Sequence, residues 1–431
     1  MTPEMIGLLG VVLLLLLLAT KMWVGPALAI SGFVGLWMLR GLPGALSVLG
    51  TVPFTNACSY SFTVIPMFML MGLVISETDI GTGLYRTANA WVGRFRGGLA
   101  SATVVACGFL GAITGSHMVG AIIMSKVALP EMKKLHYDDV LASGSVAAAA
   151  PLAIIIPPSI PMITYAIVTE TSVGKLFMGG FIPGILLAVI YCVVIWLMTL
   201  RRPDYGPAGP KVSRKDRLRS IVSILPIIVL FLFVFGGLYS GWFTVTESGA
   251  FGALGAVIIA FATRQMDLRK LYRCVVQTAR MAATVIVVLI GTYVFLNFIT
   301  MSRLTVLLTN TILSLNLSGG LVILMIAVLY VILGMFLPDM AMIVLTCPLL
   351  YPIVTALGYD GVWFGLFVVL MAALGSITPP VGMVVYLMAG VSQVPVGKIF
   401  RGVMPFIIAL LLVVLLITLF PELVLFLPNT M

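Results

Sequence analysis

Two apolar stretches of the sequence carry a pair of adjacent prolines. The residues are Ile156, Pro157, Pro158 and Ser159 in the first stretch, and Thr378, Pro379 and Pro380 in the second. Proline has no N–H, and its ring clashes with the carbonyl group four residues back, so an α-helix cannot run through it undisturbed. We expect two half-helices joined by an unwound link in each stretch. The free carbonyl oxygens of such links are ligands that suit a cation such as Na⁺.

Two other apolar stretches are interrupted by polar residues and glycine. The residues are Gly115, Ser116 and His117 in the first interruption, and Gly334, Pro338 and Asp339 in the second. The first interruption facing the first proline link, and the second facing the second link, would give two Na⁺ sites built from backbone and side-chain oxygens. The simpler alternative is that these glycines and prolines only kink packed helices.

Three ionisable residues are candidates for contact with a substrate. A carboxylate inside an apolar stretch is costly and usually functional, so Asp339 is expected to support the second cation site or to approach the substrate, unless water solvates it. His117 could contact the substrate or be a packed capping residue. Arg303 precedes the second interruption and could bind an anion or be a solvated loop residue.

The composition indicates a membrane protein. Of the 431 residues, 61% are hydrophobic and only 9% are charged, which is far too apolar for a soluble domain. The five cysteines are scattered without paired spacing and are interpreted as apolar packing residues. The sequence has no phosphate-binding loop and no metalloprotease or serine-hydrolase motif, which argues against ATP-driven pumping and against an enzyme. No organic cofactor is expected.

The chain is organised as two related halves. Tyr137-Asp138, Pro157-Pro158 and Pro183 recur as Tyr359-Asp360, Pro379-Pro380 and Pro405, always after the same interval along the chain, which we call the repeat interval. We predict a first repeat over 1–200, a basic cytoplasmic linker at 201–219 and a second repeat over 220–431. The predicted helical hairpins lie at about 99–129 and 319–350, and the broken helices at about 140–170 and 361–390. The remaining predicted spans are 6–21, 24–40, 60–78, 176–200, 221–240, 246–263, 281–300 and 402–428.

This arrangement gives each half five crossings and one re-entrant hairpin. Five is an odd number, so the two halves must be inverted relative to each other in the membrane. With both termini outside, 21 of the 24 Lys and Arg residues fall on the cytoplasmic side, as the positive-inside rule requires. Basic loops that face anionic lipid also account for the net charge of +10, without any nucleic-acid partner.

Five segments resemble the large membrane subunit of TRAP transporters, the tripartite ATP-independent periplasmic family. They begin at Leu129, Ile155, Gly174, Gly358 and Ile377 and read LPEMKK, IIPPSIPM, GKLF, GYDGVWFG and ITPPVG. The chain departs from the family at both interruptions. His117 and Met118 stand where small polar residues are usual, and the order Pro338-Asp339 replaces the more common Asp-Pro.

The resemblance implies an elevator-type carrier in the inner membrane of a bacterium or archaeon. It further implies coupling to Na⁺, a small four-helix membrane subunit, a soluble periplasmic substrate-binding protein, and a carboxylate or sulfonate as the substrate. A partner-independent anion carrier of similar architecture is the alternative, and co-purification of a small subunit would argue against it. A channel is a third possibility, and concentrative uptake would exclude it.

Overall fold

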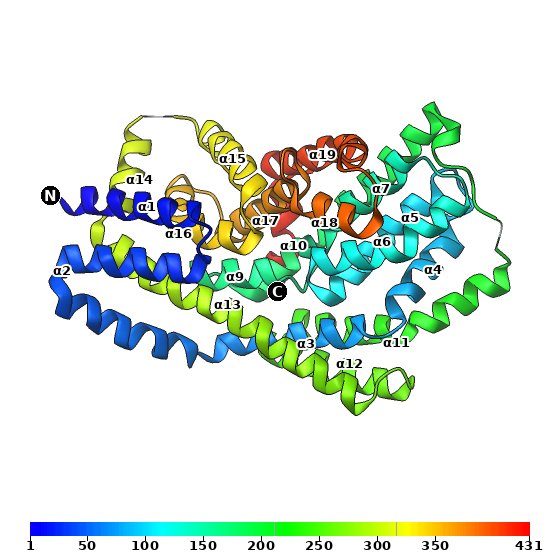
Figure 1. The fold of residues 1–431 in the computed structure, drawn as a ribbon, viewed down its shortest axis with the longest axis horizontal. Coiled ribbons are helices and arrows are strands. Elements are labelled where there is room, and N and C mark those ends of the chain that lie inside the picture. The colour runs from blue at the N-terminus through cyan, green and yellow to red at the C-terminus, as the bar shows by residue number, and fades with distance from the viewer. Residues whose placement is uncertain (211, 316) are drawn as a thin grey trace.

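The computed structural model describes residues 1–210, 212–315 and 317–431, and Lys211 of the basic linker lies outside the described residues. Within these ranges every regular element is a helix (Figure 1). By length and composition, eight of the described helices could cross a membrane, or up to ten if each of two bent pairs is one span. The prediction of an all-helical protein with many membrane spans is therefore confirmed.

The first half begins with long apolar helices. These are α1 (Pro3–Ala19), α2 (Val24–Ala57), the 3₁₀ turn η1 (Tyr60–Thr63), α3 (Val64–Ser76) and α4 (Ile80–Val92). Helix α2 extends well beyond the predicted span at 24–40, because helical structure resumes after a kink at Gly41 (φ 73°). Glycine tolerates this left-handed conformation, which would strain other residues. Helix α4 lies at 69° to the preceding helix.

A hairpin and an interrupted helix follow. The elements are α5 (Gly98–Thr114), α6 (His117–Lys134), α7 (Asp139–Ala149), α8 (Leu152–Ile155), α9 (Ile160–Thr169) and α10 (Val173–Arg201). Helices α5 and α6 are joined by only Gly115 and Ser116. The chain also breaks at Ala150-Pro151, so the predicted broken helix consists of three pieces.

The second half also contains long apolar helices, a hairpin and an interrupted helix. After η2 (Pro203–Tyr205), the elements are α11 (Arg214–Tyr239), α12 (Val245–Ala262), α13 (Leu268–Ser302), α14 (Leu304–Ser314), α15 (Gly319–Phe336), α16 (Asp339–Ala356), α17 (Gly361–Ile377), α18 (Met383–Ser392), α19 (Val396–Leu419), α20 (Glu422–Leu425) and η3 (Pro428–Thr430). Most of residues 264–280, which include five Lys and Arg residues, form one continuous helix, α13, with the span predicted at 281–300.

Corresponding helices of the two hairpins begin at corresponding positions. Helices α6 and α16 start at His117 and Asp339, which are separated by the repeat interval. Helices α5 and α15 start at Gly98 and Gly319, whose separation differs from that interval by a single position. The two proline pairs share the interval as well, and both Pro–Pro bonds are cis. The repeat interval therefore relates the helix starts of the two hairpins as well as the sequence motifs.

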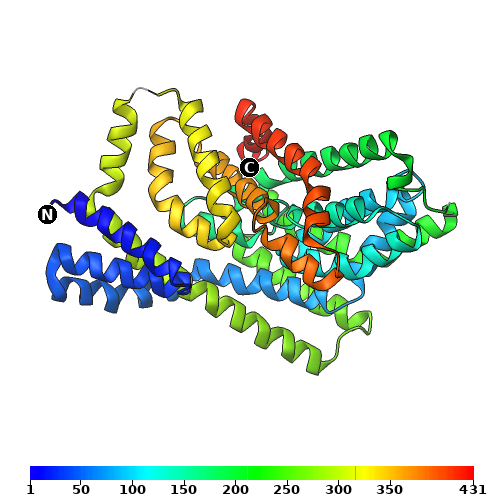
Figure 2. The ribbon, with the colours of Figure 1, turned by 45° about the horizontal axis from the view of Figure 1, so that its top comes forward.

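The hairpins and broken helices of the two halves pack into one body. Helix α7 packs on α19, α6 on α18, and α9 on α16 (Figure 2). Helices α7 and α19 approach closely at Gly144 and Gly402, where a Cβ on Gly144 would lie 2.4 Å from the carbonyl carbon of Gly402. Helices α2, α3, α12 and α13 form a second layer beneath this body, with α13 packed on α2 and α12 on α3 (Figure 1).

Candidate functional site

The tip of the first hairpin lies against the first proline link. Helix α5 ends at Gly115, whose left-handed conformation (φ 60°) allows its N–H to donate to the Gly111 carbonyl oxygen at 2.8 Å. A Cβ at Gly115 would lie 2.8 Å from the carbonyl oxygen of Pro158. Only glycine lets the tip approach the link this closely, so the structure brings together two of the predicted elements.

The first link is buried and its ends are fixed by a serine. Pro157, Pro158 and Ser159 are all buried. The Ser159 hydroxyl donates to the Ile154 carbonyl oxygen at 2.6 Å and accepts from the Met162 N–H at 3.4 Å. The Ser159 side chain therefore caps the start of α9 and also binds a carbonyl group of α8, on either side of the unwound segment.

The second link is built differently. Gly334 of α15 packs on Gly375 of α17, where a Cβ at Gly334 would be 3.0 Å from the Gly375 Cα. The Thr378 hydroxyl donates to the Leu374 carbonyl oxygen at 2.6 Å and ends α17. Thr378 and Pro379 are half-buried, and Pro380 is exposed. The second hairpin thus contacts its broken helix at Gly375, in the last turn of α17 before the link.

The two hairpin tips meet each other at His117 and Asp339. The His117 Nδ1 lies 3.2 Å from the Asp339 Oδ2, and each residue is only 7% exposed. These residues occupy equivalent positions, since each begins the second arm of its hairpin. The sequence-based prediction placed them at separate tips, although the repeat interval between them was a signal that they are related. A buried charge needs such a partner to offset its lost hydration.

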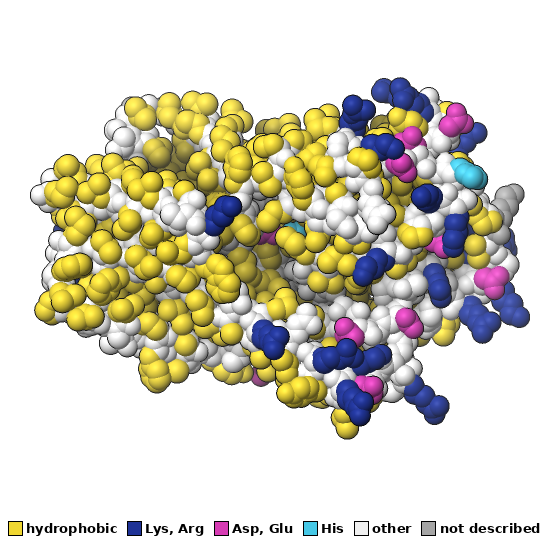
Figure 3. Space-filling model, viewed as in Figure 1, with side chains coloured by type: hydrophobic (Ala, Val, Ile, Leu, Met, Phe, Trp, Pro, Cys, Tyr) yellow, Lys and Arg dark blue, Asp and Glu magenta, His cyan; other side chains and the backbone are white. Residues whose placement is uncertain are grey.

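Two buried polar groups at the first hairpin tip are available to a ligand. The His117 Nε2 and the Thr114 hydroxyl are both buried and have no hydrogen-bond partner among the described residues. Buried polar groups are normally paired, so these two atoms mark a place where a bound ligand could complete the contacts. The space-filling view shows a histidine beside an acidic side chain at the bottom of a hollow in the middle of one face (Figure 3).

A cavity of about 590 Å³ adjoins the second tip. Leu337, Pro338 and Met340 of the hairpin form one wall, and the turn from α1 to α2 with the middle of α13 forms the other. Trp23 lines this cavity from the turn and is 75% exposed. Trp23 was not predicted from the sequence, because nothing in its local pattern related this turn to the hairpin.

Arg303 is not brought to the tips. It ends α13 in a left-handed conformation (φ 55°), and its side chain is exposed at the start of α14. The adjoining residues Ser302 and Leu304 contact Gly7 of α1. Arg303 therefore lies outside the His117–Asp339 pair, and its predicted contact with an anion stays a prediction.

The groups around the links suit a monovalent cation better than a transition metal. Among the described residues, no group of three or more His, Cys, Asp or Glu side chains could hold a metal ion. Carbonyl and hydroxyl oxygens of the two links, with the Asp339 carboxylate, are hard ligands of the kind that alkali and alkaline-earth cations prefer. The hydroxyl groups of Ser116, Ser159 and Thr378 are the candidate side-chain donors, and their binding of Na⁺ stays a prediction.

Paired hairpins, two broken helices and a buried His–Asp contact in a polytopic helical protein are the features of a membrane carrier. The family description "Tripartite ATP-independent periplasmic transporter, DctM component" matches residues 11–423, and the chain belongs to this family.

Two relatives illustrate the similarity. A C4-dicarboxylate TRAP transporter large permease protein of Pseudomonas aeruginosa is 33% identical over 400 residues, covering 90% of this chain and 93% of the relative. A sialic acid TRAP transporter large permease protein of Vibrio cholerae is 28% identical over 420 residues, covering 93% and 98%. The crystal structure of the Alcanivorax borkumensis YdaH transporter shares the fold, with a TM-score of 0.67 at 14% identity and 98% coverage of both chains.

Proposed function

We propose that this chain is the large permease subunit of a Na⁺-coupled importer of an organic anion, a carboxylate or a sulfonate. The observation that carries the proposal is the contact between His117 and Asp339, which joins two hairpin tips at equivalent positions. The buried Nε2 of His117 is free to donate to a carboxylate or sulfonate oxygen when it carries a proton. Relatives named for C4-dicarboxylate and sialic acid transport support this class of substrate.

Two Na⁺ sites flank the substrate position in this proposal. Gly115, Ser116 and the first link supply oxygens on one side, and Gly334, Pro338 and the second link supply them on the other. Binding a cation beside the buried Asp339 would offset the carboxylate charge, so that an anion could approach His117. Na⁺ binding would therefore favour substrate binding, which is the thermodynamic basis of coupled transport.

The transport step is proposed to be an elevator movement of inverted repeats. The body formed by α5–α9 and α15–α18 would slide against the layer formed by α2, α3, α12 and α13. The cavity between the second tip and the α1–α2 turn lies at the boundary of these two parts. Matching helix starts at the repeat interval support two repeats of common origin. Lys and Arg side chains gather on the right-hand half of one face, in keeping with a cytoplasmic basic side (Figure 3). Both termini are proposed to lie outside.

Family membership supports the proposed partners. These are a small four-helix membrane subunit, which would pack on exposed apolar helices in the inner membrane, and a soluble periplasmic protein that delivers the substrate. Uptake without a binding protein would instead favour the partner-independent anion carrier.

The test is uptake into proteoliposomes that contain the purified chain with its partner subunits. Radiolabelled C4-dicarboxylate, sialic acid and isethionate serve as probes under imposed Na⁺, K⁺ or proton gradients. We expect concentrative uptake only with an inward Na⁺ gradient and only with the binding protein. Equal uptake without Na⁺ would refute the coupling, and dissipative flux without accumulation would indicate a channel.

A further inference from the structure

A second cavity, which has a polar lining, lies away from the hairpin tips, where the two halves of the chain meet. Its volume is about 590 Å³. Helices α6 and α7 of the first half line one side, and the link from α18 to α19 lines the other. The side chains that could bind a polar ligand are Ser125, Lys126, Lys133, Tyr137, Asp139, Ser143, Ser392 and Gln393.

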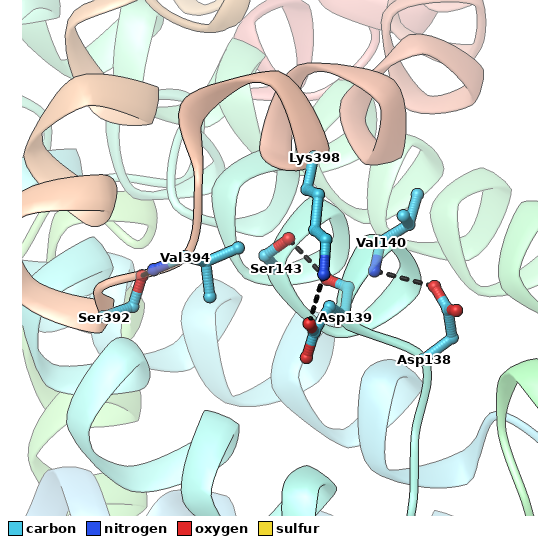
Figure 4. A network of polar contacts seen from close by, with 7 residues as sticks. All are labelled: Asp138, Asp139, Val140, Ser143, Ser392, Val394 and Lys398. Carbon is cyan, nitrogen blue, oxygen red and sulfur yellow. Dashed lines mark hydrogen bonds and ion pairs between the residues drawn. The ribbon is translucent and has the colours of Figure 1, made fainter.

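The charges that line this cavity are unbalanced in favour of cations. Lys126 and Lys133 make no ion pair among the described residues. Asp139 is neutralised by Lys398 of α19, whose Nζ lies 2.8 Å from the Asp139 carboxylate (Figure 4). The nearby Asp138 is not among the lining residues, and its carboxylate accepts the N–H of Val140 at the start of α7. Two unpaired ammonium groups therefore face one space.

Two further features point to a ligand that accepts hydrogen bonds. The Ser125 hydroxyl is buried and has no hydrogen-bond partner among the described residues, although Ser125 lines the cavity. Helix α19 begins directly after Pro395, which also lines the cavity, and no side chain caps its N-terminus. The amide groups and dipole at the start of a long helix favour an anion.

We propose that this cavity is a regulatory site for a divalent organic anion. Lys126 and Lys133 are two turns apart on α6, which separates their Cα atoms by about 10 Å along the helix axis. That spacing suits a ligand with two acidic groups better than a monoanion. Only the regulatory role of this cavity rests on the proposed function. The expected occupant is the accumulated transport substrate or another cytoplasmic dianion.

A dianion bound here would connect the two halves. It would link α6, which is an arm of the first hairpin, to the α18–α19 link, and thus reinforce the single Lys398–Asp139 contact. The packing of α6 against the α18–α19 link must change when the two repeats exchange conformations, so a ligand that joins them would slow this exchange, and cytoplasmic accumulation of the dianion would slow further import. This is feedback through a site separate from the His117–Asp339 pair.

The first experiment measures succinate binding to the full-length chain by calorimetry in Na⁺-free buffer. Wild type and Lys134→Gln are expected to bind alike, because Lys134 is on the same helix but pairs with Glu131 outside the cavity. The double variant Lys126→Gln with Lys133→Gln should bind about tenfold more weakly or not at all. Acetate should bind poorly to all three proteins, and inorganic phosphate tests whether any dianion suffices.

The second experiment loads proteoliposomes with succinate on the side of the basic loops and measures the initial rate of uptake. Internal succinate should slow wild type and Lys134→Gln but leave the double variant unaffected. Equal succinate affinity in the double variant and wild type, or no binding to wild type, overturns the site. The binding result is independent of Na⁺ coupling, so failure of the proposed transport mechanism remains distinguishable from failure of this site.

Discussion

The two proline links have closely similar sequences but different surroundings. Pro157 and Pro158 are buried beneath the first hairpin tip, whereas Pro379 is half-buried and Pro380 is exposed. The difference arises from the neighbouring hairpins, because Gly115 contacts the Pro158 carbonyl while the second tip borders the cavity lined by Trp23. The same local motif thus occurs once closed and once open within one molecule.

This asymmetry is what an alternating-access carrier requires of its repeats. If two repeats of common origin adopt different conformations, exchanging these conformations produces a second state of similar energy. Substitutions that affect one link, tip or hairpin more than its counterpart in the other half should therefore show which properties depend on the closed link and which on the open link.

The largest effect is expected from breaking the His117–Asp339 pair, which both halves share. Asp339→Ala leaves the imidazole without its buried partner, and removal of one member of a buried pair typically costs about 3–5 kcal/mol. We expect uptake to be lost and the thermal midpoint of the purified protein to fall. His117→Ala should be similarly damaging, because it leaves a buried carboxylate unpaired.

The equivalent positions offer a control for this prediction. The double exchange His117→Asp with Asp339→His keeps one imidazole and one carboxylate in contact, so it should recover much of the thermal stability that either single exchange loses. No recovery would mean that each tip requires its own residue for a separate reason.

The next effect concerns the links themselves. Pro157→Ala and Pro379→Ala remove a helix penalty of about 3 kcal/mol, so helix can extend and withdraw carbonyl oxygens from the Na⁺ sites. Uptake and Na⁺ affinity should fall more than membrane expression does, and Pro157→Ala should be the more damaging because that link is buried.

Two other prolines provide matched controls for the link variants. Pro183 and Pro405 are also related by the repeat interval but are inside α10 and α19. Pro183→Ala and Pro405→Ala should preserve Na⁺ affinity. Wild-type Na⁺ affinity in the two link variants would contradict the assignment of the links to ion sites.

A smaller effect should distinguish two glycines of the first hairpin. Gly115→Ala places a methyl group 2.8 Å from the Pro158 carbonyl oxygen in a left-handed conformation, which costs about 1–2 kcal/mol before any steric adjustment. In Gly120→Ala the Cβ meets no atom within 4 Å, and alanine favours the helix by about 0.5–1 kcal/mol. Thermal midpoints should move in opposite directions, and equal shifts would show that the tip does not close on the link.

The features that could be predicted from the sequence are those that depend on local interactions. Composition and proline chemistry are local, so the helical class and the two interrupted helices could be predicted. The repeat interval also related the two proline pairs to each other. The His117–Asp339 contact could not be derived in the same way, because it depends on how α6 and α16 pack across the two halves.

Other features depended on tertiary structure in the same manner. The continuation of α2 beyond Gly41 was missed, since a left-handed glycine can either end a helix or join two helices. Arg303 was interpreted as an anion contact or as a solvated loop residue from its charge and its position before a hairpin, and packing leaves its side chain exposed beside α1. A side chain's type shows what it could bind, but packing determines which residues it meets.

The last prediction measures the difference between the tips directly. Ser116 and Pro338 are equivalent positions, each directly preceding a member of the His117–Asp339 pair, but Ser116 is half-buried and Pro338 is exposed. Single cysteines at these positions, in a background with the five native cysteines replaced, should react with a membrane-impermeant maleimide at different rates. Cysteine at 338 should react several-fold faster in the state seen here. Na⁺ and substrate should change the two rates in opposite directions, and from opposite sides of the membrane, if inverted repeats exchange conformations. Parallel changes from a single side would instead support a fixed pore, because a pore has no second state in which the closed tip becomes the open one.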